Sequence, residues 1–392
     1  MGRPALPPRR EDELTMSRGN SCQSIVVSMM ILLLSVVGAD SADPAAKGAK
    51  APAKEHWGAI AAEAKKEGKV TIYGQVGPEL RVALTDAVKK DLGLDMELVP
   101  GKGSEVANRF LTENRAGLPS ADIVLGGAST FVSVPELYAS WEKLEPLLFL
   151  PEVLDAKAWR NGKIPFLDSQ KKVIPLVLEV TPTIIVNTTI VKPGQIKSFK
   201  DLLQPQWKGK IVMFDPTVGG TTQTWVRFLM TKIFGPTEGE AFLQKLAAQE
   251  PVITRDSRLQ SEWVARGRYP VCIGLDPQAA YGMHKTGAPI TRVAAEEGGL
   301  FTGGGGYLVV SLKRPHPNAA AAVLNWLLGP AGQEVFSNGY GASAARLGVK
   351  TDGISSLSLP LAGEKLYPQD EEIVLFKRGD EAGRRVFKPL LK

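Results

Sequence analysis

Cysteine and histidine are scarce in this sequence of 392 residues, which contains 2 cysteines and 3 histidines. Cys22 lies in an N-terminal segment that we expect to be removed, which leaves Cys272 as the single cysteine of the mature chain. Such a chain can form no internal disulfide. The three histidines, His56, His284 and His316, are too far apart in the sequence for a metal-binding motif. We therefore expect a fold held by its hydrophobic core, with no cofactor and no metal site.

Motifs for catalysis and for nucleic-acid binding are also missing. The sequence has no G-x-S-x-G, C-x-x-C or H-E-x-x-H motif and no phosphate-loop lysine signature. The four glycines at 303–306 lack the helix start of a nucleotide fingerprint, so a hinge or a close approach of the backbone is the better interpretation. The net charge is +6, but the basic residues are scattered rather than clustered. We expect neither an enzyme nor a nucleic-acid-binding protein.

Long hydrophobic runs are confined to one place, "IVVSMMILLLSVV" at residues 25–37. Arginines precede this run and small residues follow it, which is typical of a secretory signal peptide. The run is shorter than the roughly 20 apolar residues of a membrane span. We predict a signal peptide over residues 1–39, a flexible leader over 40–54 and a mature protein in the periplasm. Cleavage after Ala42 and an uncleaved anchor remain as alternatives.

Helix-like and strand-like segments alternate after residue 54. Amphipathic helix patterns at 56–68, 78–93 and 104–117 alternate with apolar strand patterns at 69–74, 94–101 and 121–126. This order indicates parallel strands in an α/β layer, where ligands bind beyond the carboxyl ends of the strands. Small or polar residues follow the strands at those ends: Gln75, Gly77, Ser104, Gly127 and Ser129.

The second half contains a long apolar run and a glycine–threonine corner. Residues 171–191 predict two strands separated by 181–183. Further on, an apolar strand ends at an Asp-Pro turn, and "TVGGTT" leads into an apolar helix. The first amides of a helix have no intrahelical partner and carry partial positive charge, and glycine lets a ligand approach them. The corner is therefore either an anion site or a plain turn with an N-cap. Its residues are Thr217, Gly219, Gly220, Thr221 and Thr222.

Two blocks of this sequence resemble a known family. "IIVNTTIVKPGQIKSFKDLLQPQWKGKIVMFDPTVGGTT" at 184–222 is similar to the central block of bacterial extracellular solute-binding proteins of the ferric-iron-binding type. "RPHPNAAAAVLNWLLGPAGQEVF" at 314–336 resembles their late helical segment. The resemblance spans roughly residues 54–350. It implies a fold of the type II periplasmic-binding-protein kind: two α/β lobes with mixed sheets, joined by two crossing strands, with the solute in a cleft between them.

The resemblance also implies a function and a division of the chain. Members are periplasmic receptors of ABC importers, so we expect a monomer whose partners are a small solute and an ABC permease with its ATPase at the inner membrane. Residues 55–178 would form the first part of lobe 1 and residues 179–300 lobe 2. Residues 301–350 would return to lobe 1 with the C-terminal helices. The tail at 351–392 shows little periodicity, and the sequence does not place it.

The iron ligands of the family have no counterpart in this sequence. Pro277 and Gln278 occupy the positions of the adjacent tyrosine pair, Gly77 that of a histidine and Gly127 that of a glutamate. Ferric iron prefers anionic oxygen ligands, which these residues do not supply. The corner that holds the synergistic anion in the ferric group is kept, at Thr217, Gly219, Gly220 and Thr221. We expect it to bind the acidic group of an organic solute, without catalysis.

Three further polar residues are candidates for the same cleft: Thr183, Arg255 and Asp276. Arg255 either clamps an acidic group with its guanidinium or lies on a solvated face. Asp276 would receive an ammonium group, so a zwitterionic solute would use both ends of the cleft. Alternatives are a ferric receptor with atypical ligands such as Tyr281 or Tyr307, an enzyme on the same two-lobed scaffold, and a sensory binding module.

Overall fold

The computed structural model describes residues 50–391, except Gln75, Lys102, Pro182 and residues 351–353. The side chains of residues 50–54, 104 and 161 are not described either. The predicted signal peptide, and the leader as far as residue 49, lie outside the described residues. None of the helices within the described part of the chain is both long and apolar enough to span a bilayer. The strands within the described residues form two sheets of five strands and one sheet of three.

The first sheet is mixed, as the sequence predicts, and its strand order is β2-β1-β3-β12-β4. β1 pairs in parallel with β2 and β3, whereas β12 runs antiparallel to β3 and β4. We call this sheet and the helices packed on it the first lobe. The strand bounds are β1 Lys69–Gly74, β2 Asp95–Pro100, β3 Ile123–Gly126, β4 Ile174–Pro175 and β12 Tyr307–Val310.

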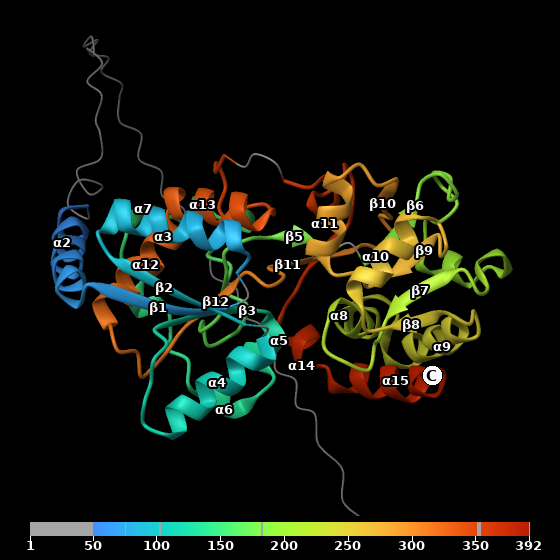
Figure 1. The fold of residues 1–392 in the computed structure, drawn as a ribbon, viewed down its shortest axis with the longest axis horizontal. Coiled ribbons are helices and arrows are strands. Elements are labelled where there is room, and N and C mark those ends of the chain that lie inside the picture. The colour runs from blue at the N-terminus through green and yellow to red at the C-terminus, as the bar shows by residue number, and fades with distance from the viewer. Residues whose placement is uncertain (1–49, 75, 102, 182, 351–353, 392) are drawn as a thin grey trace, which may run out of the picture. The chain divides into compact units, whose positions relative to one another are not determined.

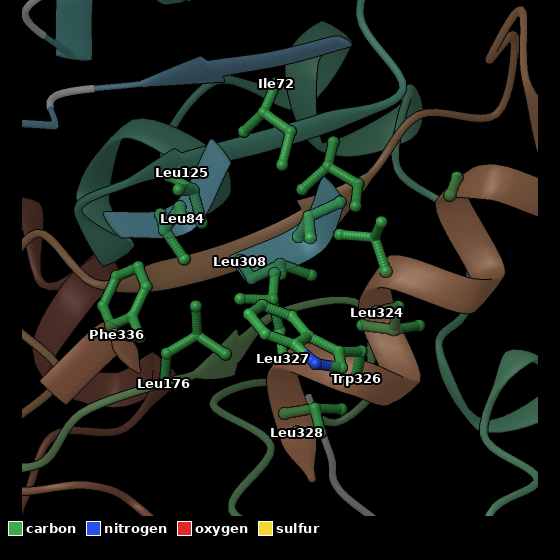
Figure 2. Packing of buried hydrophobic residues seen from close by; sticks show 14 of the residues in the cluster. Ile72, Leu84, Leu125, Leu176, Leu308, Leu324, Trp326, Leu327, Leu328 and Phe336 are labelled. Carbon is green, nitrogen blue, oxygen red and sulfur yellow. The ribbon is translucent and has the colours of Figure 1, made fainter. Parts of the chain in front are cut away.

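Helices cover both faces of this sheet, which is why β1, β3 and β12 are mostly buried along their length, whereas the edge strand β2 exposes Asp95 and Glu97. In β1, Val70 and Ile72 are buried on one face and Tyr73 is buried on the other. Figure 2 shows side chains that meet on the first face: Ile72, Leu84, Leu125, Leu176, Leu308, Leu324, Leu327 and Phe336. The helices on that face are α2 Lys50–Glu67, α3 Pro78–Leu92, α12 Pro317–Leu328 and α13 Pro330–Tyr340. On the opposite face lie α4 Gly103–Arg115, α5 Ala128–Val132 and α6 Pro135–Ala139.

The second sheet is also mixed, with strand order β10-β6-β9-β7-β8. We call this sheet and its helices the second lobe. In β7, Ile211 and Met213 pack into one core and Val212 into the core on the other face. The bounds are β6 Ile184–Asn187, β7 Ile211–Phe214, β8 Val252–Thr254, β9 Val271–Ile273 and β10 Ile290–Arg292. Its helices include α8 Thr221–Phe228, α9 Gly235–Ala247, α10 Ser257–Ala265 and α11 Pro277–Lys285.

Two crossing strands join the lobes, which confirms the predicted fold. β5 (Glu179–Val180) leads from the first lobe to the second, and β11 (Gly299–Thr302) leads back. They pair antiparallel, with Glu179 opposite Thr302. In Figure 1 both strands lie between the two large sheets. The lobe assignments 55–178, 179–300 and 301–350 remain our proposal for the division of the chain.

The apolar run at 171–191 forms three short strands, so the prediction of two long strands is wrong. β4 pairs with β12 in the first sheet, β5 pairs with β11, and β6 pairs with β9 and β10 in the second sheet. Most of the run is apolar because β4, β5 and β6 are all buried, each in a different sheet. The sequence pattern indicates that these strands are buried, but it does not indicate that each of them pairs in a different sheet.

The C-terminal segment, which the sequence left unplaced, contacts both lobes. β13 (Leu366–Pro368) adds a strand beside β11 in the three-stranded sheet. In α14 (Glu371–Leu375), Ile373 packs into the core of the second lobe and Val374 into that of the first. α15 (Lys377–Phe387) then packs against α8 and α9, as Figure 1 shows at the lower edge of the second lobe.

Candidate functional site

A cavity of about 610 Å³ lies between the two lobes. The first lobe contributes Gly103, Gly127, Ser129, Thr130 and Tyr340 to its wall. The second lobe contributes Gly219, Gly220, Thr221, Thr224, Asp276 and Gln278. The connecting segments contribute Glu179, Thr181, Thr302, Gly304, Gly305 and Gln369. None of the described residues that line this cavity is lysine, arginine or histidine.

The start of α8 forms one part of the wall. Its N-cap residue is Gly220, whose φ of 152° favours glycine, and no side chain of the described residues caps the helix. The first hydrogen bond of the helix runs from the Thr224 amide to the Gly220 carbonyl at 3.1 Å. Among the described residues, no acceptor meets the amides of Thr221, Thr222 and Gln223. Of these three residues Thr221 lines the cavity, so its N–H group remains available to an acceptor there.

Six of the residues singled out from the sequence line this cavity: Gly127, Ser129, Gly219, Gly220, Thr221 and Asp276. They come from segments far apart in the sequence, at the ends of β3, β7 and β9. Ser129 also accepts a hydrogen bond from Arg227 of α8, with 3.1 Å between Nη1 and Oγ. That bond connects the first lobe to the second beside the cavity.

Thr217 and Arg255 both contact Asp215 instead of lining the cavity. The Thr217 amide donates to Asp215 Oδ1 at 2.8 Å, and Arg255 Nε donates to Oδ2 at 2.7 Å. Burial acts to raise the pKa of Asp215, but these bonds outweigh it and the pKa is lowered. Arg255 borders a separate pocket beside Ile253 and Leu391. Its guanidinium is thus engaged by a carboxylate of its own lobe.

Thr183 and Thr222 lie behind the wall. The Thr183 carbonyl accepts a hydrogen bond from the Gly274 amide at 2.8 Å. The Thr222 side chain is fully buried against the same glycine, and a Cβ at position 274 would lie 1.8 Å from Thr222 Oγ1. Gly274 has φ 70° as well, so both the backbone and the packing require glycine there. These contacts fix the end of β9 against the start of α8.

Two of the remaining predicted residues, Gly77 and Ser104, lie at the starts of helices in the first lobe. Gly77 is the N-cap of α3 and is not among the cavity-lining residues. Ser104 lies in the first turn of α4 rather than at its N-cap, because the helix begins at Gly103, which does line the cavity. The Ser104 side chain and the whole of Gln75 lie outside the described residues.

Asp276 has a structural role and also borders the cavity. Its carboxylate caps α11 by accepting a hydrogen bond from the Ala279 amide at 3.0 Å. Pro277 and Gln278, which follow it, line the cavity too. The start of α11 therefore presents Pro277 and the neutral amide of Gln278 at the positions where the sequence resemblance would place two tyrosines, directly after the Asp276 carboxylate.

Glu179 is the main residue of the cavity wall that sequence reasoning missed. It is 0% exposed, and its Oε2 accepts a hydrogen bond from the Tyr281 hydroxyl at 2.6 Å. Oε1 is buried and has no partner among the described residues. Burial raises the pKa of Glu179 to about 7; the Tyr281 hydrogen bond opposes this rise and the charge of Asp276 adds to it. The available signal was a single charged residue inside the apolar run "VIPLVLEVTPTIIV".

The four-glycine run passes close to this carboxylate. A Cβ on Gly304, where φ is 56°, would lie 2.4 Å from Glu179 Oε1. The Gly305 amide donates to the Tyr340 hydroxyl at 2.8 Å, and the Gly303 amide donates to Tyr307 at 3.0 Å. Glycine is thus needed because the backbone turns tightly against Glu179 and the tyrosine hydroxyls.

Comparison with known proteins identifies the family and the fold. The family model for bacterial extracellular solute-binding proteins matches residues 83–357. No curated protein matches the sequence.

Three solved structures are similar to this chain in fold. The Trichodesmium protein IdiA (FutA), in complex with iron and citrate, has 20% identity and a TM-score of 0.65 over 82% of this chain and 99% of its own. Ferric iron-binding protein A of Mannheimia haemolytica, in an open conformation, has 17% identity and a TM-score of 0.65 over 82% and 98%. AfuA of Actinobacillus pleuropneumoniae, with fructose 6-phosphate, has 19% identity and a TM-score of 0.59 over 82% and 97%. The fold is that of these two-lobed binding proteins, and the chain belongs to the family of bacterial extracellular solute-binding proteins.

Proposed function

We propose that this protein is the periplasmic receptor of an ABC-type importer and that it binds a small organic solute with an acidic group, without changing the solute chemically. The observation that carries the proposal is the cavity of about 610 Å³, which both lobes line and at which the uncapped start of α8 lies. Family membership supports the receptor role, and the start of α8 supports the choice of an acidic group.

The acidic group would bind at Gly219, Gly220 and Thr221. These residues line the cavity, and the Thr221 amide has no acceptor among the described residues. Hydrogen bonds from N–H groups to an anion are stronger than neutral ones, and the helix dipole adds about 0.3–2 kcal/mol. No atom of the other described residues lies within 4 Å of the place where a Cβ on Gly219 would stand, so the solute can approach the backbone closely.

Closure of the lobes about β5 and β11 would couple binding to transport. A solute that contacts Ser129 in the first lobe and Thr221 in the second gains contacts only when the lobes are close together. Such a solute shifts the population toward the closed form in proportion to its differential affinity. The closed form is the one that an ABC permease would recognise, which makes the permease and its ATPase the proposed partners.

A ferric site is supported less well. The hydroxyls of the two tyrosines considered for it, Tyr281 and Tyr307, form hydrogen bonds within the protein. Tyr281 donates to Glu179, and Tyr307 accepts from the Gly303 amide. Burial raises the pKa of both hydroxyls, which disfavours the phenolate that binds ferric iron.

A thermal-shift screen of the purified exported protein tests the proposal. The panel contains inorganic anions, organic acids, amino acids, phosphate esters, polyamines and ferric citrate. We expect one class of organic acid to raise Tm by several degrees, and mass spectrometry to recover it unchanged. An altered product would support the enzyme alternative. A shift with ferric citrate alone, together with a tyrosinate absorption band, would support the ferric alternative.

A further inference from the structure

We propose that the Glu179 carboxylate is the receptor for an ammonium group, so that the protein selects solutes with an ammonium group at one end and an acidic group at the other. This inference rests on the proposed function, because it assigns the second end of the solute that α8 would hold. The inference adds a solute-binding side chain that lies on the crossing strand β5 rather than on either five-stranded sheet.

The first observation is a buried oxygen without a partner. Glu179 is 0% exposed and belongs to the cavity wall, and its Oε1 has no hydrogen-bond partner among the described residues. Burying a carboxylate oxygen without a hydrogen-bond donor lowers the stability of the folded protein, usually by more than burying an unpaired neutral polar group does. An N–H donor from a ligand in the cavity would remove that cost on binding.

The second observation is the charge around Glu179. Two titratable groups of the α11 region, Tyr281 and Asp276, shift the pKa of Glu179. The charge of Glu179 in turn raises the pKa values of three tyrosines: Tyr281, Tyr340 of α13 and Tyr307 of β12. The described lining residues include two carboxylates, Glu179 and Asp276, and no lysine, arginine or histidine. A cationic ligand group is therefore the natural counterpart of this end of the cavity.

A solute with several hydroxyl groups is the competing occupant. Hydroxyls donate hydrogen bonds to a carboxylate, but they bring no positive charge to offset Glu179 and Asp276. The two classes differ in their effect on protonation. An ammonium group stabilises ionised Glu179 and lowers its pKa from about 7, so binding near neutral pH releases a proton. A neutral hydroxyl produces no comparable release.

The sign of the pH dependence follows from this linkage. Glu179 must be ionised to bind the ammonium group, so affinity rises with pH through the pKa of about 7 in the empty protein. From pH 6 to pH 8 the ionised fraction, and hence the association constant, increases about tenfold. Tyr281→Phe removes a hydrogen bond that lowers this pKa and therefore moves the midpoint to higher pH.

Isothermal titration calorimetry of the purified exported protein tests the inference. The probes are ω-amino carboxylates of two to six carbons, each paired with the carboxylate that lacks the amine, together with O-phosphoethanolamine, ethyl phosphate and glucose 6-phosphate. Titrations at pH 6, 7 and 8, in buffers of different ionisation enthalpy, measure affinity and proton release. The variants are Glu179→Gln, Tyr281→Phe and, as a control at an exposed glutamate, Glu63→Gln.

The inference predicts that one amino probe binds wild type at least tenfold more tightly than its partner without the amine. This preference should increase with pH, be lost in Glu179→Gln and be kept in Glu63→Gln. If Glu179→Gln does not fold, the upward shift of the pH midpoint in Tyr281→Phe decides.

Equal binding of paired probes, or tighter binding of glucose 6-phosphate without proton release, would overturn the inference and leave the proposed acidic-group site standing. If no acidic probe binds at all, the proposed function fails.

Discussion

Replacing Glu179 with glutamine should stabilise the empty protein at neutral and alkaline pH while it removes a proposed ligand contact. The folded-state pKa of Glu179 is about 7, compared with an ordinary value of 4.5. The folded state therefore binds more protons than the unfolded state between these values. The stability contributed by the protonated carboxyl is fully present below pH 4.5 and is lost as pH rises through 7.

The size of this effect follows from the difference between the two pKa values. A rise from 4.5 to about 7 corresponds to about 3 kcal/mol, which is a large part of a typical unfolding free energy of about 5–15 kcal/mol. Glutamine keeps an acceptor for the Tyr281 hydroxyl and has no charge to bury. The unfolding free energy of the variant minus that of wild type should therefore increase by about 3 kcal/mol between pH 4.5 and pH 8.

Urea unfolding of the ligand-free protein at half-unit steps from pH 4.5 to pH 8.5 measures this difference. The control is Glu63→Gln, an exposed pair partner of Lys66, for which the difference should stay within about 1 kcal/mol at every pH. If the difference in unfolding free energy between Glu179→Gln and wild type did not change with pH, the reasoning would be refuted. Such a result would mean that Glu179 has the same pKa in the folded and the unfolded state.

Three further predictions follow from other contacts. Gly219→Leu, which has open space for its side chain, should lower affinity for the acidic solute at least tenfold in calorimetry with little change in Tm, whereas Gly58→Leu on α2 should leave affinity unchanged. Arg227→Met leaves the buried Asp380 unpaired and should lower the free energy of unfolding, measured in urea, by about 3–5 kcal/mol. Adding Asp380→Leu should recover part of this loss; if the losses of the two single variants simply added in the double variant, the prediction would be wrong. Burial raises the pKa of the Cys272 thiol, so iodoacetamide should label it only after unfolding, and rapid labelling of the native protein would argue against a buried thiol.

Much of the fold was readable from local patterns. In α3, Pro78 at the first position, apolar residues at Leu84 and Val88 and the left-handed Gly93 after the last turn all mark a helix, and the structure has it there. The parallel pairing of the first strands also followed from the alternation of helix and strand patterns. These features depend on residues that are neighbours in the sequence.

The features that sequence reasoning missed depend on distant partners. Arg255 was a candidate to bind an acidic solute because no neighbouring residue in the sequence indicates its ion pair with Asp215, which lies 40 positions away. β13 gains its strand character only by pairing with β11. Glu179 was visible as a charge in an apolar run, but its position on the cavity wall depends on the crossing of the chain between lobes.

The most direct test of the account is a crystal structure of the protein with the tightest-binding solute from the screen. The account predicts the solute between the lobes, with its acidic group at Gly219, Gly220 and Thr221 and an ammonium nitrogen within hydrogen-bonding distance of Glu179 Oε1. A solute bound outside this cavity, or with its acidic group away from the start of α8, would contradict it.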